Sequence, residues 1–271
     1  MKPFCRVRTF FLGWSLVMLT VVGGRTAIAA PAWLIEAHAH NDYLHSRPLV
    51  DALEQGFCNV EADIWLIDGE LRVAHDRARA LPGLTLEKLY LDPLQARIRR
   101  NGGRVFRGGP PVTLLIDIKS DGTNTYRTLT VALKNYHGML TRFYPDRTET
   151  NAILVVISGE RPRGLMLAEG ERWAGYDGRL ADLDPPLSPH FMPWVSEDWK
   201  KVFQWEGRGT MPMDERQRLR EWAMTAGRHG VKLRFWGTPE LPACWKELRE
   251  AGVGLISTDD LAGYRAFVEG R

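Results

Sequence analysis

The sequence has few of the features that would place it in a specialised class of protein. It contains only 3 cysteines in 271 residues, so it is not a small scaffold held together by disulfides. No internal repeat, low-complexity tract or Ser/Gly-rich linker divides it, which excludes solenoids and strings of small domains. Because 44% of its residues are hydrophobic and 25% are charged, it is neither disordered nor fibrous. A single globular domain is the simplest interpretation.

The chain also lacks an excess of charge where a nucleic-acid partner would need it. The formal net charge is +3, but Lys2, Arg6, Arg8 and Arg25 all lie in the first 29 residues, which contain no acidic side chain. The rest of the chain carries 32 basic against 33 acidic residues. This balance gives no support for nucleic-acid binding.

The first 29 residues have the pattern of a secretory signal peptide. A basic start precedes an apolar run over 10–22, and the small residues Ala-Ile-Ala follow at 27–29. The run is shorter than the roughly 20 residues of a membrane span, so an uncleaved anchor is the less favoured alternative. We therefore expect a signal peptide over 1–29, cleaved near Ala29, and one secreted or periplasmic domain over 30–271. Neither stable membrane insertion nor a protein partner is expected of the mature chain.

Short apolar runs alternate with helical patterns through the mature chain. Six runs are rich in β-branched residues and bounded by Gly, Pro, Asp or Asn, which is typical of buried parallel strands. They cover 33–37, 59–66, 112–118, 153–157, 231–235 and 253–256, with two more strands expected near 173–174 and 191–195. Apolar residues three or four apart predict helices over 49–53, 86–98, 128–136, 213–226 and 241–248. The alternation predicts an α/β fold, a (β/α)8 TIM barrel, with a doubly wound open sheet as the alternative.

Polar residues gather where the first two strands are expected to end, which is where such barrels carry their chemistry. The segment His-Ala-His-Asn-Asp at 38–42 follows the first strand, although a capped turn with a solvated His40 would give the same pattern. Glu61 and Asp63 lie two apart in the second strand, so both point to the same face. Unless they are solvated, two acids on one face need a cation, and oxygen ligands suit Mg²⁺ or Ca²⁺.

A histidine and a third acid are expected to join this pair. The turn Asp68-Gly69 predicts a hairpin that brings His75 back toward the two carboxylates. Asp117 and Lys119 lie two apart near the end of an apolar strand, where a simple structural ion pair is the alternative interpretation. Three acids, two histidines and a lysine together predict a divalent-cation site for phosphoryl chemistry.

The motifs that carry these residues resemble those of a known superfamily. They are His-Ala-His-Asn-Asp-Tyr at 38–43, Gly-Phe-Cys-Asn-Val-Glu-Ala-Asp at 56–63, Asp-Gly-x-Leu-x-Val-x-His-Asp at 68–76 and Leu-Ile-Asp-Ile-Lys at 115–119. Their order and spacing are similar to those of glycerophosphodiester phosphodiesterases, sphingomyelinase D enzymes and phosphatidylinositol-specific phospholipases C, which share a TIM barrel. The most similar branch is the one related to altered-inheritance-of-mitochondria proteins.

The resemblance implies a role for each matching residue. It implies that His38 and His75 are the catalytic pair, and it assigns the cation and substrate contacts as well. The cation, Mg²⁺ or Ca²⁺, would be held by Glu61, Asp63 and Asp117, and the substrate would be contacted by Lys119, Trp236 and Asn41. The chain departs from glycerophosphodiester phosphodiesterases because no Arg-Gly follows the first histidine and no Glu-Asn-Thr stretch comes later. The resemblance gives no role to His40 or Asp42.

We therefore predict a metal-dependent phosphoric diester hydrolase whose substrate is a small-molecule or lipid phosphodiester, of the glycerophosphodiester or phospholipid type. His38 is the expected base and His75 the expected acid. One alternative is a metal-dependent amidohydrolase-type hydrolase in which His38 and His40 bind a transition metal.

A second alternative is a secreted binding protein whose tryptophans stack on a ligand. The tryptophans considered for this role are Trp173, Trp194, Trp199, Trp205 and Trp236. Cys58 and Cys244 fall in separate parts of the expected barrel, so no disulfide between them is predicted.

Overall fold

Eight parallel strands of this protein pair side by side until the last meets the first. The computed structural model describes Met1 and residues 33–271, so the predicted signal peptide and its cleavage point at Ala29 lie outside the described residues. The strands follow the order β1-β2-β4-β7-β8-β9-β10-β11, and β11 pairs with β1 in parallel. The ring is therefore closed, which confirms the predicted (β/α)8 TIM barrel and excludes an open doubly wound sheet.

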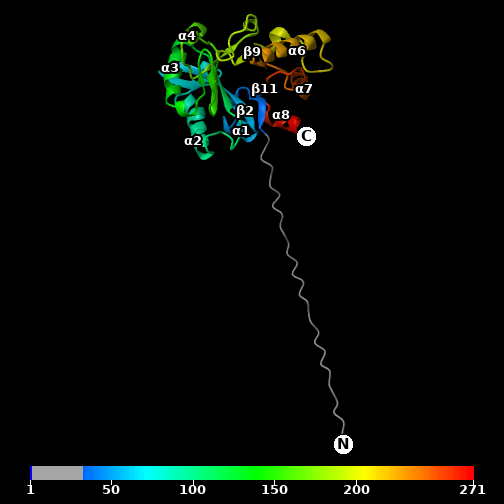
Figure 1. Cartoon of the computed structure of the whole chain (residues 1–271), viewed down its shortest axis with the longest axis horizontal. Coiled ribbons are helices and arrows are strands. Elements are labelled where there is room, and N and C mark those ends of the chain that lie inside the picture. Colours follow the sequence, from blue (N-terminus) through cyan, green and yellow to red (C-terminus); the bar gives the residue numbers. More distant parts are fainter. Residues whose placement is uncertain (2–32) are drawn as a thin grey trace. The chain divides into compact units, whose positions relative to one another are not determined.

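The elements of the barrel follow the chain in the expected alternation, with the helices outside the strands (Figure 1). The barrel strands are β1 (Leu34–Ala39), β2 (Phe57–Ile67), β4 (Val112–Ile118), β7 (Ile153–Gly159), β8 (Gly175–Gly178), β9 (Trp194–Asp198), β10 (Lys232–Trp236) and β11 (Leu255–Thr258). The helices are α1 (Val50–Glu54), α2 (Asp92–Arg100), α3 (Gly122–Lys134), α4 (Arg163–Ala168), α5 (Trp199–Val202), α6 (Met213–Arg228), α7 (Pro242–Ala251) and α8 (Leu261–Glu269). Three short strands complete the fold, β3 (Glu70–Val73) and the pair β5 (Arg142–Phe143) and β6 (Thr148–Glu149).

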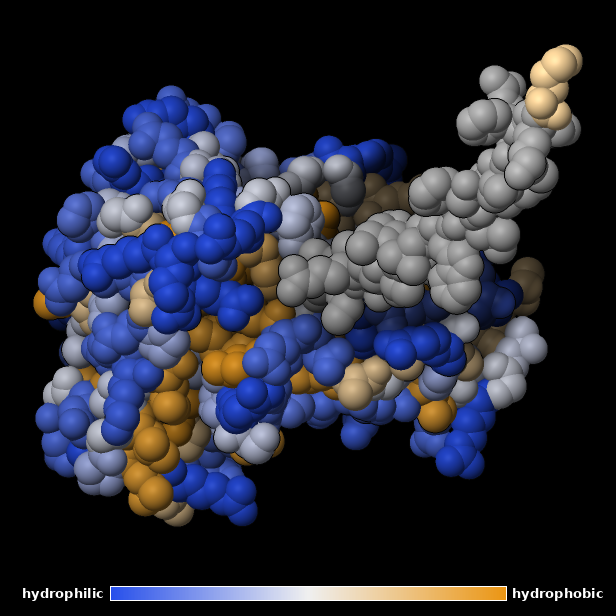
Figure 2. All heavy atoms as spheres, turned by 90° about the horizontal axis from the view of Figure 1, so that it is seen from below, coloured by the Kyte–Doolittle hydropathy of each residue, from blue (hydrophilic) through white to orange (hydrophobic). Residues whose placement is uncertain are grey.

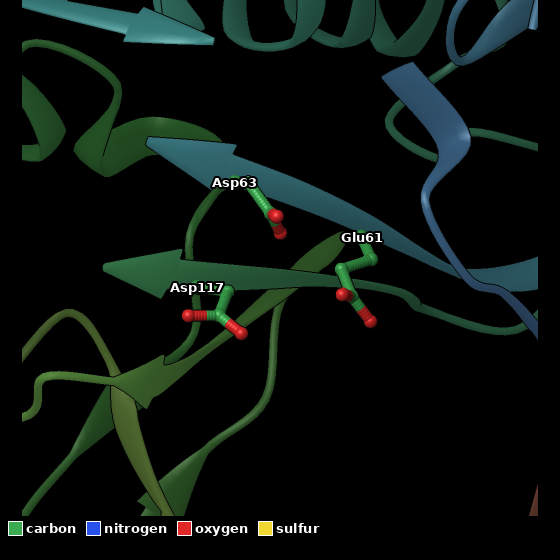
Figure 3. Close-up of side chains that lie close together, drawn as sticks. All are labelled: Glu61, Asp63 and Asp117. Carbon is green, nitrogen blue, oxygen red and sulfur yellow. The ribbon is translucent and has the colours of Figure 1, made fainter. Parts of the chain in front are cut away.

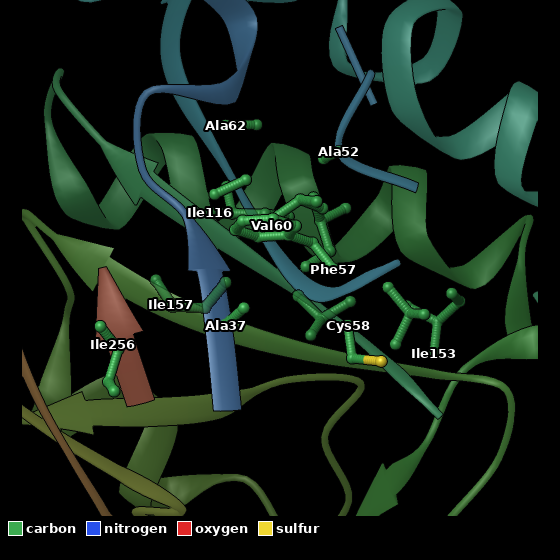
Figure 4. Close-up of a cluster of buried hydrophobic side chains, with 14 of the residues drawn as sticks. Ala37, Ala52, Phe57, Cys58, Val60, Ala62, Ile116, Ile153, Ile157 and Ile256 are labelled. Carbon is green, nitrogen blue, oxygen red and sulfur yellow. The ribbon is translucent and has the colours of Figure 1, made fainter. Parts of the chain in front are cut away.

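The period of two along each strand separates two apolar clusters. Cys58, Val60 and Ala62 of β2 point away from the barrel axis and pack with residues such as Ile116 and Ile157 in the main hydrophobic core (Figure 4). A second, smaller apolar cluster contains the residues of opposite parity on the barrel strands, at the inward-facing positions. It consists of Leu115, Val156, Trp194 and Leu255, with Leu154 packed against it. The inward positions of β2 are the polar ones, which leaves its acids facing the interior.

A tight hairpin brings the chain back to the second strand. Asp68 and Gly69 both have positive φ, at 53° and 81°, as expected of the turn type that joins two twisted strands. β3 pairs antiparallel with β2, and the backbone N–H of Ala74 then donates to Asp63 O (3.1 Å). The predicted return of His75 toward the acids is therefore confirmed.

The strand β8 begins later in the chain than the sequence predicted. A strand was expected at 173–174, but β8 begins at Gly175. The two residues at 172–173 contact the β5–β6 hairpin instead. Arg172 forms a β-bridge with Phe143, and Trp173 lies under the Arg142 guanidinium. Neither that hairpin nor α8 was expected from the sequence.

The surface and the two cysteines have ordinary properties. The large apolar side chains that are exposed belong to many different elements, and the face in Figure 2 is mostly hydrophilic with apolar patches between charged residues. Among residues 33–271, no helix is both long and apolar enough to cross a bilayer. Cys58 and Cys244 are free thiols, and burial raises the pKa of each to about 12.

Candidate active site at the barrel mouth

Three carboxylates meet at the carboxyl end of two neighbouring strands. Glu61 and Asp63 come from β2 and Asp117 from β4, and parallel pairing sets Asp63 beside Asp117. Each offers an oxygen atom, and these oxygens all lie within 4.8 Å of one another. Figure 3 shows the three side chains on the same side of the two strands. The two predicted features, two acids on one face and a third from the next strand, are therefore brought together.

In each carboxylate, the hydrogen bonds from the protein fall on one oxygen. Asp63 Oδ2 accepts from Tyr43 and His75, and Glu61 Oε2 is bonded by His38 Nε2 and Arg234 Nη2. The other oxygens, Asp63 Oδ1 and Asp117 Oδ1, are buried without a hydrogen-bond partner among the described residues. A buried carboxylate oxygen without a partner is costly, so these residues fit a hard divalent cation.

The charges in the cluster shift its pKa values in opposite directions. Burial and the neighbouring Glu61 raise the pKa of Asp63, and burial raises the pKa of Asp117 to about 6. Burial opposes ionisation of Glu61 too, but the Arg234 guanidinium, His40 and His38 together outweigh it and hold the pKa of Glu61 well below its usual value. Lys119 supplies a second positive charge, with Nζ 3.2 Å from Asp63 Oδ2 and 3.1 Å from Asp117 Oδ2.

His38 lies inside the barrel beneath the carboxylates. It is completely buried, and its ring meets Trp194 edge to face. Burial and the nearby Arg234 lower its pKa to about 3, so it is neutral at pH 7. Because the ionised Glu61 can only accept, His38 carries its proton on Nε2 and donates to Glu61 Oε2 over 2.9 Å. His38 therefore fixes the orientation of Glu61.

His40 lies above His38, at the cavity, with 20% of its side chain exposed. Its Nδ1 lies 2.9 Å from Asp259 Oδ1, which directs Nε2 toward the cavity and within 3.9 Å of Glu61 Oε1. Burial would lower the pKa of His40, but Glu61 and the bond to Asp259 outweigh it and raise the pKa. The family resemblance left this residue without a role.

His75 stands on the other side of the carboxylates and is 58% exposed. Its Nδ1 lies 3.0 Å from Asp63 Oδ2, and Nε2 has no partner in the described part of the chain, so it is available to a substrate. Tyr43 supports the same carboxylate, since its hydroxyl lies 2.7 Å from both Asp63 Oδ2 and Asn41 Oδ1 and can donate to one of them at a time.

A cavity of about 490 Å³ joins these groups, which is within the usual range for small-molecule sites. It is lined by His40, Asn41, Glu61, His75, Asp117, Ile118, Lys119, Ser158, Gly159, Glu160, Arg179, Arg234, Trp236 and Gly237. All predicted site residues except Asp63 and His38 therefore line it, and those two lie directly behind it. A second cavity of about 710 Å³ shares His40 and Gly237 with the first.

Four residues of the site were given no role by sequence reasoning. They are Tyr43, Arg179, Arg234 and Asp259. Arg234 did leave a signal, because it is a single arginine in an apolar strand, two residues before Trp236 and hence on the same face. Arg179 left no usable signal in the sequence, because the predicted position of the strand before it was wrong.

The fold and site together define a TIM-barrel protein with a phosphodiesterase type of architecture. Residues 26–177 match the AIM6-like phosphodiesterase domain, and the chain belongs to this family. Altered inheritance of mitochondria protein 6 of Saccharomyces cerevisiae is 30% identical over 83% of this chain and 68% of its own length. The Lachancea thermotolerans protein of that name is 29% identical over 83% of this chain, and the match spans 64% of the length of that relative. An Arthroderma benhamiae homolog is 25% identical over 86% of this chain and 83% of its own length.

Solved structures of glycerophosphodiester phosphodiesterases share the fold. The one from Parabacteroides distasonis superposes with a TM-score of 0.50 at 16% identity, covering 87% of this chain and 97% of that chain. The one from Agrobacterium tumefaciens gives a TM-score of 0.51 at 14% identity, covering 86% and 98%. Identities this low relate the folds and leave the activity of this chain to its own residues.

Proposed function

We propose that this protein is a divalent-cation-dependent phosphoric diester hydrolase acting on a small-molecule or lipid phosphodiester. The observation that carries the proposal is the cluster of Glu61, Asp63 and Asp117, in which buried carboxylate oxygens have no hydrogen-bond partner within residues 33–271 and lie beside an open cavity. These residues would hold Mg²⁺ or Ca²⁺, which would neutralise charge on the phosphate oxygens. Lys119 would bind the phosphate at the edge of the cluster.

The cavity offers two histidines for proton transfer, and they differ from the expected pair. His40 presents Nε2 and His75 is exposed beside Asp63, whereas His38 is completely buried and its Nε2 is committed to Glu61. In our proposal, His40 deprotonates the nucleophile and His75 protonates the leaving alkoxide, while His38 is a positioning residue for Glu61.

The geometry gives less support to the two other functions. Among residues 33–271, the grouping of side chains suited to a metal contains three carboxylates and no histidine, which disfavours a transition-metal amidohydrolase. Three of the five tryptophans considered for the binding-protein alternative, Trp194, Trp199 and Trp205, are buried. They therefore expose little ring surface on which a ligand could stack.

Hydrolysis of bis(4-nitrophenyl) phosphate and a panel of lipid phosphodiesters tests the proposal. The purified chain is expected to turn over at least one of them with Mg²⁺ or Ca²⁺ and none in EDTA. Glu61→Gln should abolish turnover, while Asp146→Asn, which alters an exposed carboxylate outside the cavity, should not. Turnover that persists in EDTA, or in Glu61→Gln, would rule out the proposed site.

Steady-state kinetics should distinguish the roles of the three histidines, because their substitutions should change different quantities. His40→Ala and His75→Ala should each lower kcat by ~10²–10⁴-fold even when the cation is saturating. His38→Ala should mainly weaken the apparent affinity for the cation, because Glu61 loses a hydrogen bond. If His38→Ala lowers kcat at saturating cation as far as His40→Ala does, the assignment of His40 is wrong.

We also propose, on the composition of residues 1–29, that this segment is a cleaved signal peptide and that the mature chain is secreted or periplasmic. Mass spectrometry of the exported protein tests this. A mature chain beginning at Ala30 is expected, and an intact N-terminus would contradict it.

A further inference from the structure

Arg179 lines the same cavity from the side opposite to His40. It follows β8, and in the closed ring β8 is four strands away from β1 in either direction. His40 follows β1, and the carboxylates belong to β2 and β4. Around the ring, Arg179 is therefore two strands from Asp117 on β4 and three strands from Glu61 and Asp63 on β2.

A buried polar network holds Arg179 in place. Asp177 is completely buried and accepts hydrogen bonds from Ser158 Oγ (2.7 Å), Ser196 Oγ (2.6 Å) and Arg179 Nη1 (3.1 Å). Arg179 Nη1 also donates to Gly178 O (2.9 Å). Within residues 33–271, no hydrogen bond is made by Arg179 Nε or Nη2, so one edge of the guanidinium is available.

An aromatic ring supports the same guanidinium from its face. The guanidinium carbon of Arg179 lies 4.9 Å from the centre of the Trp236 ring, and 26% of the side chain is exposed. A stacked, anchored arginine with a free edge loses little further entropy when it binds a planar or tetrahedral anion through two hydrogen bonds. Glu160 also lines this cavity, but its side chain is exposed to solvent.

We propose that Arg179 forms a second anion-binding subsite, so that the substrate is a phosphodiester with a further phosphate or carboxylate on one substituent. This inference rests on the proposed phosphodiesterase function. The scissile phosphate would lie at the carboxylates with Lys119, at the ends of β2 and β4, and the second anion would bind at Arg179, which follows β8 two strands further round the ring. Arg179 is anchored through Asp177, which is not one of the three carboxylates of the cation cluster.

Matched synthetic substrates test the subsite. In each pair, a 4-nitrophenyl phosphodiester carries an alkyl chain that ends either in a hydroxyl or in a phosphate, with chains of increasing length. The wild-type chain should prefer the phosphate-bearing member by ~10–100-fold in kcat/KM at the best length. Arg179→Gln should remove that preference, and Arg179→Lys should retain part of it. Arg163→Gln removes a nearby charge outside the cavity and should leave the preference intact.

The outcomes separate this inference from the proposed function. Equal turnover of both members by wild type, or an equal loss for both in Arg179→Gln, would overturn the second subsite while leaving the phosphodiesterase standing. If no member is hydrolysed with any cation, titration of inorganic phosphate in EDTA decides. Phosphate binding that is lost only in Arg179→Gln would support the anion site, and binding that does not depend on Arg179 would overturn it.

Discussion

Arg234 and Glu61 form a buried ion pair, and replacing Arg234 should destabilise the fold. Its Nη2 lies 2.5 Å from Glu61 Oε2, and both side chains are almost completely buried, at 3% and 4% exposed. Arg234→Met keeps most of the volume but leaves Glu61 ionised beside two other carboxylates. Removing one partner of a buried pair costs about 3–5 kcal/mol, a large part of the roughly 5–15 kcal/mol that stabilises a typical domain.

A divalent cation should restore part of this loss. A ligand that binds only the folded chain stabilises it by about 2.7 kcal/mol at a hundred times its Kd. The cluster in Arg234→Met has one more uncompensated negative charge, so we expect added Mg²⁺ or Ca²⁺ to stabilise this variant more than wild type. Arg234→Met combined with Glu61→Gln should recover much of the stability in EDTA, because the buried charge is gone.

Urea unfolding in EDTA and in excess cation measures both effects. Arg220→Met, on the exposed face of α6, is the matched control and should change the free energy of unfolding by no more than about 0.5 kcal/mol. The reasoning is refuted if Arg234→Met unfolds in EDTA within about 1 kcal/mol of wild type, or if the cation stabilises the variant no more than wild type.

Three further predictions concern residues around the site and the thiols. Burial raises the pKa of Asp42 to about 6, so the stability that its protonated form contributes is present below about pH 4 and is lost as the pH rises to 6. Relative to Asp42→Asn, wild type should therefore lose about 3 kcal/mol between pH 4 and 7 in urea titrations, and a constant difference would contradict this. Gly159 has a φ of +70° and a Cβ there would lie 2.0 Å from Asp117 Oδ1, so Gly159→Ala should cost about 1–3 kcal/mol and weaken cation binding in calorimetry. Unchanged cation affinity would argue against that crowding. Cys58 and Cys244 should react with a thiol reagent only after unfolding, and rapid labelling of the native chain would show that they are accessible.

The strand pattern and the faces of the strands were readable from the sequence because both depend on neighbours along the chain. The expected strand 112–118 coincides with β4, and the helix expected over 241–248 is α7, which is followed by Gly252 at a φ of 80°. The period of two is sufficient to place Glu61 and Asp63 on one face of their strand. The family motifs rest on the same local spacing.

Other parts of the site depended on contacts that no local pattern contains. Arg234 lies 173 residues after Glu61, and Asp259 lies 219 residues after His40. The strand before Arg179 was misplaced because Trp173, which was expected in it, instead packs against Arg142 and the main hydrophobic core. The sequence also does not show how deeply a side chain lies in the barrel. The spacing of His38 and His40 puts both on one face, but it does not indicate which of them reaches the cavity.

The sequence by itself determined a barrel of alternating strands and helices with three acids and His75 at the carboxyl ends of its first strands. It did so because side-chain direction along a strand is a local property. Only the tertiary structure decided that His38 is buried under Glu61 while His40 faces the cavity, and that Arg234 and Arg179 line the same cavity. Those contacts exist only once the barrel closes, because closure brings together strands that are distant in the chain.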